Sequence, residues 1–141
     1  MLEDLLTGAM QSVVYGIVGV VLMAAGFGLV DVLTPGKLRD LIWVQRNGNA
    51  ALLLAANQLG IAAIVFTAIF TSYDDFAKGL ASTTVFGLVG LLIMALAFFA
   101  LDLLTPGRLG AIICADEPHP AARVSAATHF GAALIVCACI A

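Results

Sequence analysis

Four long apolar stretches dominate the chain, and three shorter and more polar segments separate them. They cover residues 13–33, 50–70, 84–104 and 122–141. Each is close to the ~20 residues that a helix needs to cross the hydrocarbon core of a bilayer. The fourth stretch is the weakest, because Arg123, Thr128 and His129 interrupt it. The pattern predicts an all-α membrane protein with four transmembrane helices.

The composition supports a membrane environment and excludes several other classes. The chain of 141 residues is 62% hydrophobic and 11% charged, with a mean hydropathy of +1.11. A soluble domain is roughly 45–50% apolar and about 25% charged, and so small a globule could not bury this excess of apolar surface. The net charge of −3 without a basic cluster argues against nucleic-acid binding.

One motif occurs twice and indicates an internal repeat. Asp31–Leu38 reads D-V-L-T-P-G-K-L, and Asp102–Leu109, 71 positions later, reads D-L-L-T-P-G-R-L. The same ungapped register aligns residues 16–19 with 87–90 and residues 55–60 with 126–131. We therefore predict one membrane domain, residues 1–141, formed by tandem duplication of a helical hairpin, with repeats at roughly 13–70 and 84–141. Parallel repeats of this kind are related by an axis along the membrane normal.

The repeated motif has the residues of a hinge. Its members are Asp31, Thr34, Pro35, Gly36 and Lys37, with Asp102, Thr105, Pro106, Gly107 and Arg108 in the second copy. A residue before proline avoids the helical conformation, so the threonine should end the preceding helix. Thr-Pro is also a suitable N-cap and first-turn pair for a following helix. Leucine and isoleucine then recur at helical spacing, which predicts a short helix in the membrane interface.

The two aspartates of the hinges require a partner. Asp31 and Asp102 lie near the C-terminal ends of the predicted helices, where the helix dipole disfavours an anion. They are also close to the hydrocarbon boundary, where a charge is costly. Lys37 and Arg108 are the first candidates, either within one hinge or exchanged between the two. A turn pinned by a salt bridge is favoured over a proton or ion site.

Polar residues inside the apolar stretches form a second group of candidates. They are Asn57, Gln58, Thr128 and His129. Such residues commonly form hydrogen bonds between helices, and an intramembrane histidine is also a candidate for ion handling. The 71-residue register places Gln58 opposite His129, so no symmetric histidine pair exists. This argues against a metal or proton-relay site, and we expect no metal and no cofactor.

Asparagine and proline mark the expected starts of two helices. Asn49 stands where a helix N-cap is expected, ahead of an apolar run. Pro120 stands at the equivalent place and suits the first turn of a helix.

Small residues recur at helical spacing and predict close packing of helices. The candidate positions are Gly16, Gly19, Gly26, Gly60, Gly87, Gly90 and Gly131. Small residues allow helix backbones to approach where lipid removes the hydrophobic driving force. These faces either pack within one four-helix bundle or meet another subunit of a homo-oligomer.

The basic residues predict the orientation. Lys37, Arg39, Arg46, Arg108 and Arg123 lie in or beside the first and third connections. The positive-inside rule places both hinges in the cytoplasm and both termini outside. Trp43 then lies at the inner headgroup level and Tyr73 at the outer. The three cysteines do not form a disulfide framework, and Cys114 should stay reduced in the cytoplasm.

The motif also resembles that of a known family. The duplicated D-x-L-T-P-G-[KR]-L, followed by Gly-Asn-Ala-Ala-Leu at residues 48–52, resembles an uncharacterised UPF-type family of small bacterial inner-membrane proteins, built from two copies of a domain of unknown function. The resemblance covers residues 15–136. It implies a multi-pass plasma-membrane protein with four helices, and it implies no catalytic or binding residues. The second copy departs from the pattern, with Pro-His-Pro at residues 118–120 in place of Asn-Gly-Asn at residues 47–49.

The sequence favours a non-enzymatic function. It contains no H-E-x-x-H, G-x-S-x-G or P-loop motif. We expect a scaffold or accessory membrane protein that acts through oligomerisation or a cytoplasmic protein partner. The alternative is a minimal ion or small-solute transporter or channel subunit. That alternative requires Asp31, Asp102, Asn57 and His129 to converge on one polar cavity.

Overall fold

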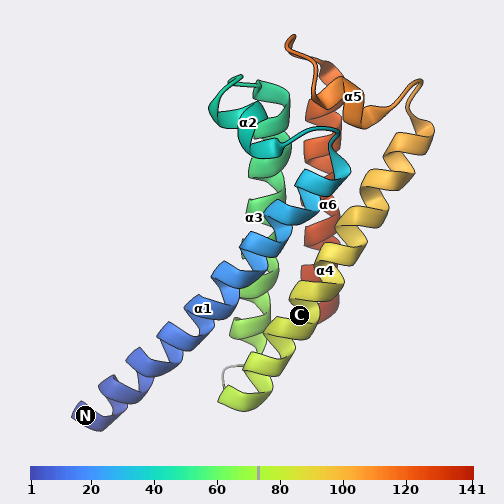
Figure 1. The fold of residues 1–141 in the computed structure, drawn as a ribbon. Helices are drawn as coiled ribbons and strands as arrows, with labels where there is room; N and C mark the ends of the chain where they lie inside the picture. The colour runs from blue at the N-terminus through green and yellow to red at the C-terminus, as the bar shows by residue number, and fades with distance from the viewer. Residues whose placement is uncertain (73) are drawn as a thin grey trace.

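The computed structural model describes residues 1–72 and 74–141, and this part of the chain forms six helices (Figure 1). They are α1 (Leu2–Leu33), α2 (Leu38–Trp43), α3 (Gly48–Thr71), α4 (Phe76–Leu104), α5 (Leu109–Ile113) and α6 (Pro120–Ile140). The helices α1, α3, α4 and α6 are long and apolar enough to cross a membrane. The predicted all-α membrane fold with four spans is therefore confirmed, while the tandem duplication stays a prediction. Tyr73, the predicted outer anchor, lies outside the described residues.

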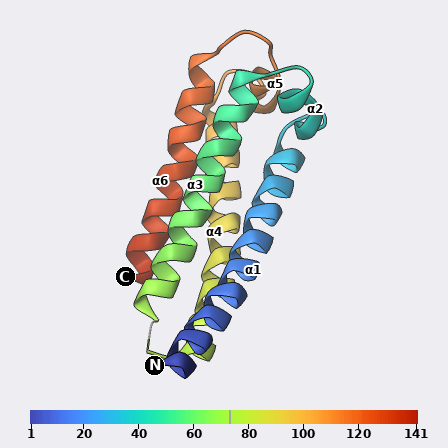
Figure 2. The ribbon, with the colours of Figure 1, turned by 90° about the vertical axis from the view of Figure 1, so that its left-hand side faces the viewer.

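The short helices lie together at one end of the bundle. In Figure 2, α2 and α5 are neighbours at the top, and both chain termini lie toward the other end. The helices α1 and α4 run toward the short helices, and α3 and α6 run back from them. As a result α3 and α6 are parallel, and they pack along each other as the central pair of the bundle.

The first helix leans away from the others at its N-terminal end (Figure 1). Its 32 residues correspond to about 48 Å, which exceeds the ~30 Å of the hydrocarbon core. Leucines and other large apolar residues in this half, such as Leu5 and Met10, are exposed. In a bilayer they face lipid, so α1 is the least enclosed of the four spans.

The core has two parts along the bundle axis. Leu22, Ile61, Ile64, Leu91 and Met94 are among the residues that fill the middle. The second part lies beneath the short helices and consists of Val30, Leu38, Leu41, Ala50, Leu53, Phe98, Leu109 and Ile113. Apolar residues of the short helices, predicted to mark an interfacial segment, thus close the end of the bundle.

The glycines do not share one packing role. A Cβ atom on Gly26, Gly87 or Gly90 would lie within 2.5 Å of a neighbouring side chain. At Gly19 the nearest contact would be an ordinary 3.6 Å, and at Gly16 nothing lies within 4 Å. Gly16 therefore has no close neighbour within the chain, and packing of this part of α1 against another subunit stays a prediction.

Gly60 and Gly131 differ although the 71-residue register aligns them. A Cβ on Gly60 would lie 2.8 Å from Cβ of Ala133 and 3.0 Å from Cε of Met94. A Cβ on Gly131 would meet nothing within 4 Å. Gly60 therefore allows α3 to approach α6, whereas Gly131 lies on a more open side of α6.

We expect Gly60→Ala to lower the free energy of unfolding by about 1–3 kcal/mol, because overpacking a well-packed contact costs that much. Ala133 cannot move aside by rotation, since its Cβ is fixed to the α6 backbone. Gly131→Ala is the matched control and should leave stability nearly unchanged. Unfolding of both variants in detergent, followed by circular dichroism, measures the difference. Equal midpoints for Gly60→Ala and Gly131→Ala would contradict the packing of α3 on α6.

Candidate functional site

The first hinge begins where Thr34 ends α1. The Thr34 backbone is extended, with φ −104° and ψ 130°, and its hydroxyl donates to the carbonyl of Val30 at 2.8 Å. Gly36 follows with φ 108°, a conformation that glycine adopts without steric cost. Helix α2 then starts at Leu38, with Lys37 at the N-cap position. Thr34 is thus a helix end, as predicted, and the alternative N-cap role is wrong.

The second hinge repeats this geometry. Thr105 ends α4, and its hydroxyl donates to the carbonyl of Leu101 at 2.7 Å. Gly107 has φ 103°, and Arg108 stands at the N-cap position of α5. Neither Lys37 nor Arg108 caps its helix with a side chain.

The aspartates cap the short helices from a distance of seven residues. The backbone N–H of Leu38 donates to Oδ1 of Asp31, and the N–H of Leu109 donates to Oδ1 of Asp102, both at 2.6 Å. The first N–H groups of a helix have no partner within the helix, and an anion at this end is favourable. Each carboxylate therefore interacts with the N-terminus of the short helix, although its residue lies near the C-terminus of the long helix.

The predicted salt bridges of the hinges are wrong. The described residues form one ion pair, between the N-terminal amine of Met1 and Asp4 at 2.8 Å. In this part of the chain, neither Asp31 nor Asp102 forms an ion pair with a basic side chain. The physical reason is that a backbone N–H becomes available to each carboxylate once the Pro-Gly turn folds the chain back. The cost of an anion near the hydrocarbon is met by a charge-assisted hydrogen bond.

The second hinge packs directly against the first. The thiol of Cys114 donates to the carbonyl of Pro35 at 2.9 Å. Gly110 lies so close that a Cβ there would be 2.7 Å from Cδ of Pro35 and 3.2 Å from the carbonyl oxygen of Leu33. Burial also raises the pKa of the Cys114 thiol, so the thiol stays protonated at neutral pH.

Two asparagines fasten the start of α3 to the connection between α5 and α6. Asn47, not Asn49, is the N-cap of α3, because its Oδ1 accepts from the N–H of Ala50 at 2.9 Å. The Nδ2 of Asn47 donates to the carbonyl of Ala115 at 3.0 Å. The sequence-based assignment of the cap to Asn49 is therefore wrong by two residues.

Asn49 forms the larger part of this contact. It is 6% exposed, and its Nδ2 donates to the carbonyls of Ala115 and Glu117 at 3.2 and 2.8 Å. Its Oδ1 accepts from the N–H of His119 at 3.1 Å. Sequence analysis did not predict this role, although the signal was present in the replacement of Asn-Gly-Asn by Pro-His-Pro in the second copy.

Helix α6 begins differently from α3. Pro120 is its first residue, as predicted, and Nδ1 of His119 accepts from the N–H of Ala121 at 3.1 Å. The two helix starts, Gly48 and Pro120, are 72 positions apart, whereas the short helices start 71 positions apart. The 71-residue register therefore holds for the short helices and shifts by one position at the starts of α3 and α6.

This shift changes which residues correspond in the bundle interior. Counted from the helix starts, Asn57 and His129 both occupy the tenth position, and both are fully buried. Gln58, which was predicted to correspond to His129, is half-buried. Its Nε2 donates to the carbonyl of Met23 at 3.0 Å.

The four intramembrane polar residues bond to nearby backbone groups. Nδ2 of Asn57 donates to the carbonyl of Gly26 at 3.1 Å, so Asn57 and Gln58 both connect α3 to α1. Thr128 and His129 instead contact backbone carbonyls of α6 itself: the Thr128 hydroxyl donates to Val124 at 2.9 Å. The hydrogen bonds of Asn57 and Gln58 thus join two helices, whereas those of Thr128 and His129 stay within α6.

His129 is fully buried, and its Nε2 has no hydrogen-bond partner among the described residues. Its Nδ1 lies 3.3 Å from the carbonyl oxygen of Ser125. Its ring meets the Phe98 ring edge-on, with the centroids 5.9 Å apart. The surface cavities at either end of the described structure are not lined by Asn57 or His129.

The residues proposed for a transport path do not converge. Asp31 and Asp102 each bind the backbone of their own hinge. Asn57 binds the backbone of α1, and His129 packs against Phe98. The transporter hypothesis required one polar cavity shared by all four residues, and the described structure does not place them in one.

Comparisons with known proteins place the chain among membrane proteins without an assigned activity. Residues 4–140 match the family described as Domain of Unknown Function (DUF350). A UPF0719 transmembrane protein of Mycolicibacterium paratuberculosis is 35% identical over 119 residues, which are 84% of this chain and 79% of the relative. UPF0719 transmembrane proteins of Mycobacterium bovis and Mycobacterium tuberculosis are each 34% identical over 139 residues, 99% of this chain and 91% of each relative. No solved structure matches.

We expect Asp31→Ala to lower the free energy of unfolding by about 1–3 kcal/mol, because the N–H of Leu38 loses its acceptor in a buried place. Asp31→Asn keeps an acceptor oxygen and should retain most of the stability. Thermal unfolding in detergent measures both variants, and Asp102→Ala with Asp102→Asn repeats the comparison in the second hinge. If the asparagine variants were as unstable as the alanine variants, the charge itself, and not the cap, would be essential.

Proposed function

We propose that this chain, which belongs to the DUF350 family, is a scaffold or accessory subunit of the bacterial plasma membrane. Its relatives are named as transmembrane proteins, and their names state no activity. In this proposal the paired hinges form a cytoplasmic surface that binds a protein partner. The function is structural and not enzymatic.

The observation that supports the proposal is the way in which the two hinges are fastened together. The hinge end is held by the Asp31 and Asp102 caps, by the Cys114 contact with Pro35 and by Asn49. These hydrogen bonds pair polar groups within the structure. The exposed charged side chains at the hinge end take no part in them. A rigid surface with free charges is suited to binding, because little conformational entropy is lost when a partner docks.

We define the hinge surface as the exposed charged residues of the two hinges and the connections that follow them. Its basic members are Lys37, Arg39, Arg46 and Arg108, and its acidic members are Asp40, Asp116 and Glu117. None of them forms an ion pair within the described residues. Charges of both signs, placed on a fixed backbone, can select a partner by electrostatic complementarity.

The orientation of this surface is part of the proposal. The basic residues near the hinges favour the cytoplasmic side. Both termini would then face outward, because they lie toward the other end of the bundle (Figure 2). A cytoplasmic partner requires this orientation.

Single cysteines test the orientation. In a background of Cys114→Ser, Cys137→Ala and Cys139→Ala, we expect Glu3→Cys to react with a membrane-impermeant maleimide on intact cells. Glu117→Cys should react only after the membrane is permeabilised. Both glutamates are exposed, so access depends on the side of the membrane. The opposite labelling would contradict a cytoplasmic hinge surface.

Site-specific photo-crosslinking in the native membrane tests the partner. We expect a photoreactive residue at Gln45 or Asp116 to give one discrete product with the same protein, because both positions are exposed at the hinge end. Phe66, which is 69% exposed in the C-terminal half of α3, away from the hinge end, is the control position and should not give this product. Lys37→Ala with Arg108→Ala should remove the product without changing the unfolding midpoint.

Two results would contradict the partner proposal. One is the absence of a discrete product from both hinge positions in cells that express the protein at native levels. The other is an equal yield of the same product from Phe66, which would show contact through the lipid-facing side of the bundle.

A further inference from the structure

A groove of about 670 Å³ lies between the end of α1 and the short helix α2. We call it the α1–α2 groove, and it is lined by Phe27, Lys37, Arg39, Asp40, Trp43 and Val44. Its size falls within the range of about 300–1,000 Å³ that is typical of small-molecule sites. The groove has an apolar wall, formed by Phe27, Trp43 and Val44. Neither the cap of the first hinge nor the proposed partner surface explains this wall.

The charged wall of the groove favours an anion. Lys37 and Arg39 contribute two positive charges and Asp40 one negative charge, so the lining has an excess of one positive charge. Asp31, the nearest acid of the hinge motif, bonds to the N–H of Leu38 and not to either basic side chain. Lysine and arginine are the residues that bind phosphate groups in proteins.

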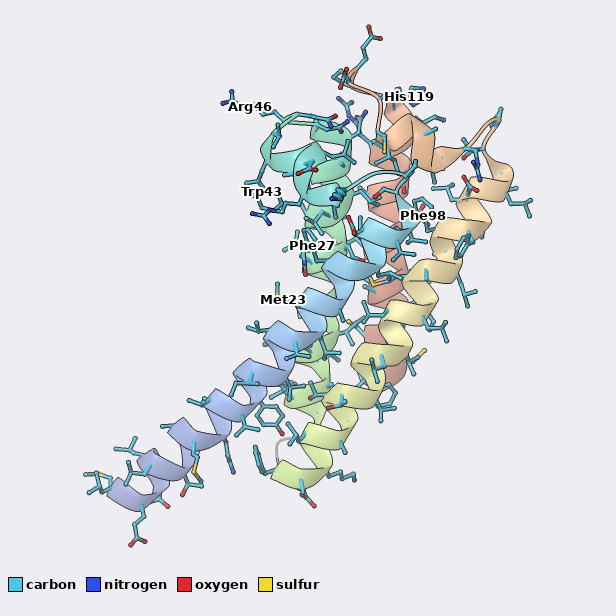
Figure 3. All side chains as sticks on the ribbon, viewed as in Figure 1. Met23, Phe27, Trp43, Arg46, Phe98 and His119 are labelled. Atoms are coloured by element: carbon cyan, nitrogen blue, oxygen red, sulfur yellow. The ribbon has the colours of Figure 1, made fainter. Side chains whose placement is uncertain are left out.

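The apolar wall continues from the groove toward the middle of the membrane. The rings of Trp43 and Phe27 lie with their centroids 6.3 Å apart. Met23 lies one helical turn before Phe27 on the same face of α1. Figure 3 shows Trp43, Phe27 and Met23 following one another down one flank of the bundle. A ligand with an anionic head and an apolar tail would match both walls.

The surface at the mouth of the groove is apolar and unusual for a helix end. Trp43 is 64% exposed and Val44 is 74% exposed. Tryptophan is enriched at the headgroup level of bilayers, where one part of the ring is in apolar and another in polar surroundings. An exposed tryptophan at the end of a membrane-spanning bundle is typical of the headgroup level.

The corresponding groove of the second hinge is less basic. It has about 420 Å³ and one basic residue, Arg108, in its lining, where the first groove has two. Gly110 stands 71 positions after Arg39 and contributes no charge, and Pro35 of the first hinge occupies part of the wall. The chain thus contains a built-in comparison, in which one groove is better suited to an anion than the other.

We propose that the α1–α2 groove binds an anionic phospholipid. Lys37 and Arg39 hold the phosphate, Trp43 covers the glycerol region, and an acyl chain follows Phe27 and Met23 along α1. The occupant is a lipid and not free phosphate, because the groove opens onto an apolar flank that a free anion would leave uncovered. Lys37, Arg39 and Asp40 belong to the hinge surface as well, so the lipid site is tested in vesicles that contain no protein partner.

Trp43 is the single tryptophan of the chain and reports directly on the site. The full-length protein is placed in vesicles of phosphatidylglycerol and phosphatidylcholine at one fixed ratio. Bromine, which quenches tryptophan at short range, is carried on the acyl chains of one lipid or the other. Two basic residues near the lipid surface contribute about 1 kcal/mol each, so the ratio of phosphatidylglycerol to phosphatidylcholine beside Trp43 should exceed the bulk ratio by about 30-fold.

Matched variants separate the groove from the general surface charge. Lys37→Gln with Arg39→Gln should remove the enrichment, so that the lipid composition beside Trp43 is close to the bulk composition. Arg39→Gln alone should reduce the enrichment in part. Arg46→Gln is the control, because Arg46 is exposed near the same membrane surface but does not line the groove. It should leave the enrichment unchanged. The single Arg39→Gln variant decides the test if the double variant does not fold.

Three results would overturn the proposal. Quenching by the two brominated lipids in proportion to their bulk amounts would show no preference. Loss of the preference in Arg46→Gln as large as in the groove variants would indicate surface charge without a site. Loss of the preference on adding inorganic phosphate at constant ionic strength would show that the groove takes a free anion.

Discussion

The hydrogen bond from the Leu38 N–H to Asp31, with its counterpart from Leu109 to Asp102, determines how the chain turns at the edge of the membrane. A helix that leaves the hydrocarbon through a Pro-Gly turn exposes N–H groups at the start of the next helix. Leaving such a group unpaired in a buried place costs about 1–3 kcal/mol. The carboxylate supplies the acceptor, and its charge is favourable at a helix N-terminus. The cap also fixes Leu38 and Leu109, which close the core at this end.

Once each hinge is fixed, the two can bind each other through different contacts. Gly110 and Cys114, in α5 and at its end, contact Pro35 of the first hinge, while Asn49 at the start of α3 holds the connection before α6. The repeated motif therefore produces two similar turns, and unlike residues outside the motif join them. The same asymmetry leaves a charged groove beside the first hinge, and Pro35 forms part of the wall of the second.

Sequence patterns predicted the parts of the fold that depend on residue type and period. Hydropathy is sufficient to locate the four long helices, and the proline and leucine positions locate the short ones. The partner of Asp31 was predicted wrongly, because charge pairing can be read from sequence whereas the path of a Pro-Gly turn cannot. Asn49 was assigned to capping because its position before an apolar run suits a cap, but the true cap, Asn47, begins the helix earlier. Gly60 and Gly131 have different surroundings because the shift between the starts of α3 and α6 rotates one helix face relative to the other.

Hydrogen exchange at the backbone amides of Leu38 and Leu109 measures the two caps directly. In the protein in nanodiscs, followed residue by residue by NMR, both amides should exchange far more slowly than the amides of Gly36 and Gly107 in the adjoining turns. Asp31→Ala should accelerate exchange at Leu38 while Leu109 stays protected, and Asp102→Ala should do the reverse. Exchange at Leu38 and Leu109 in the unaltered protein as fast as at the turn glycines would contradict the caps, and with them the fixed hinge surface.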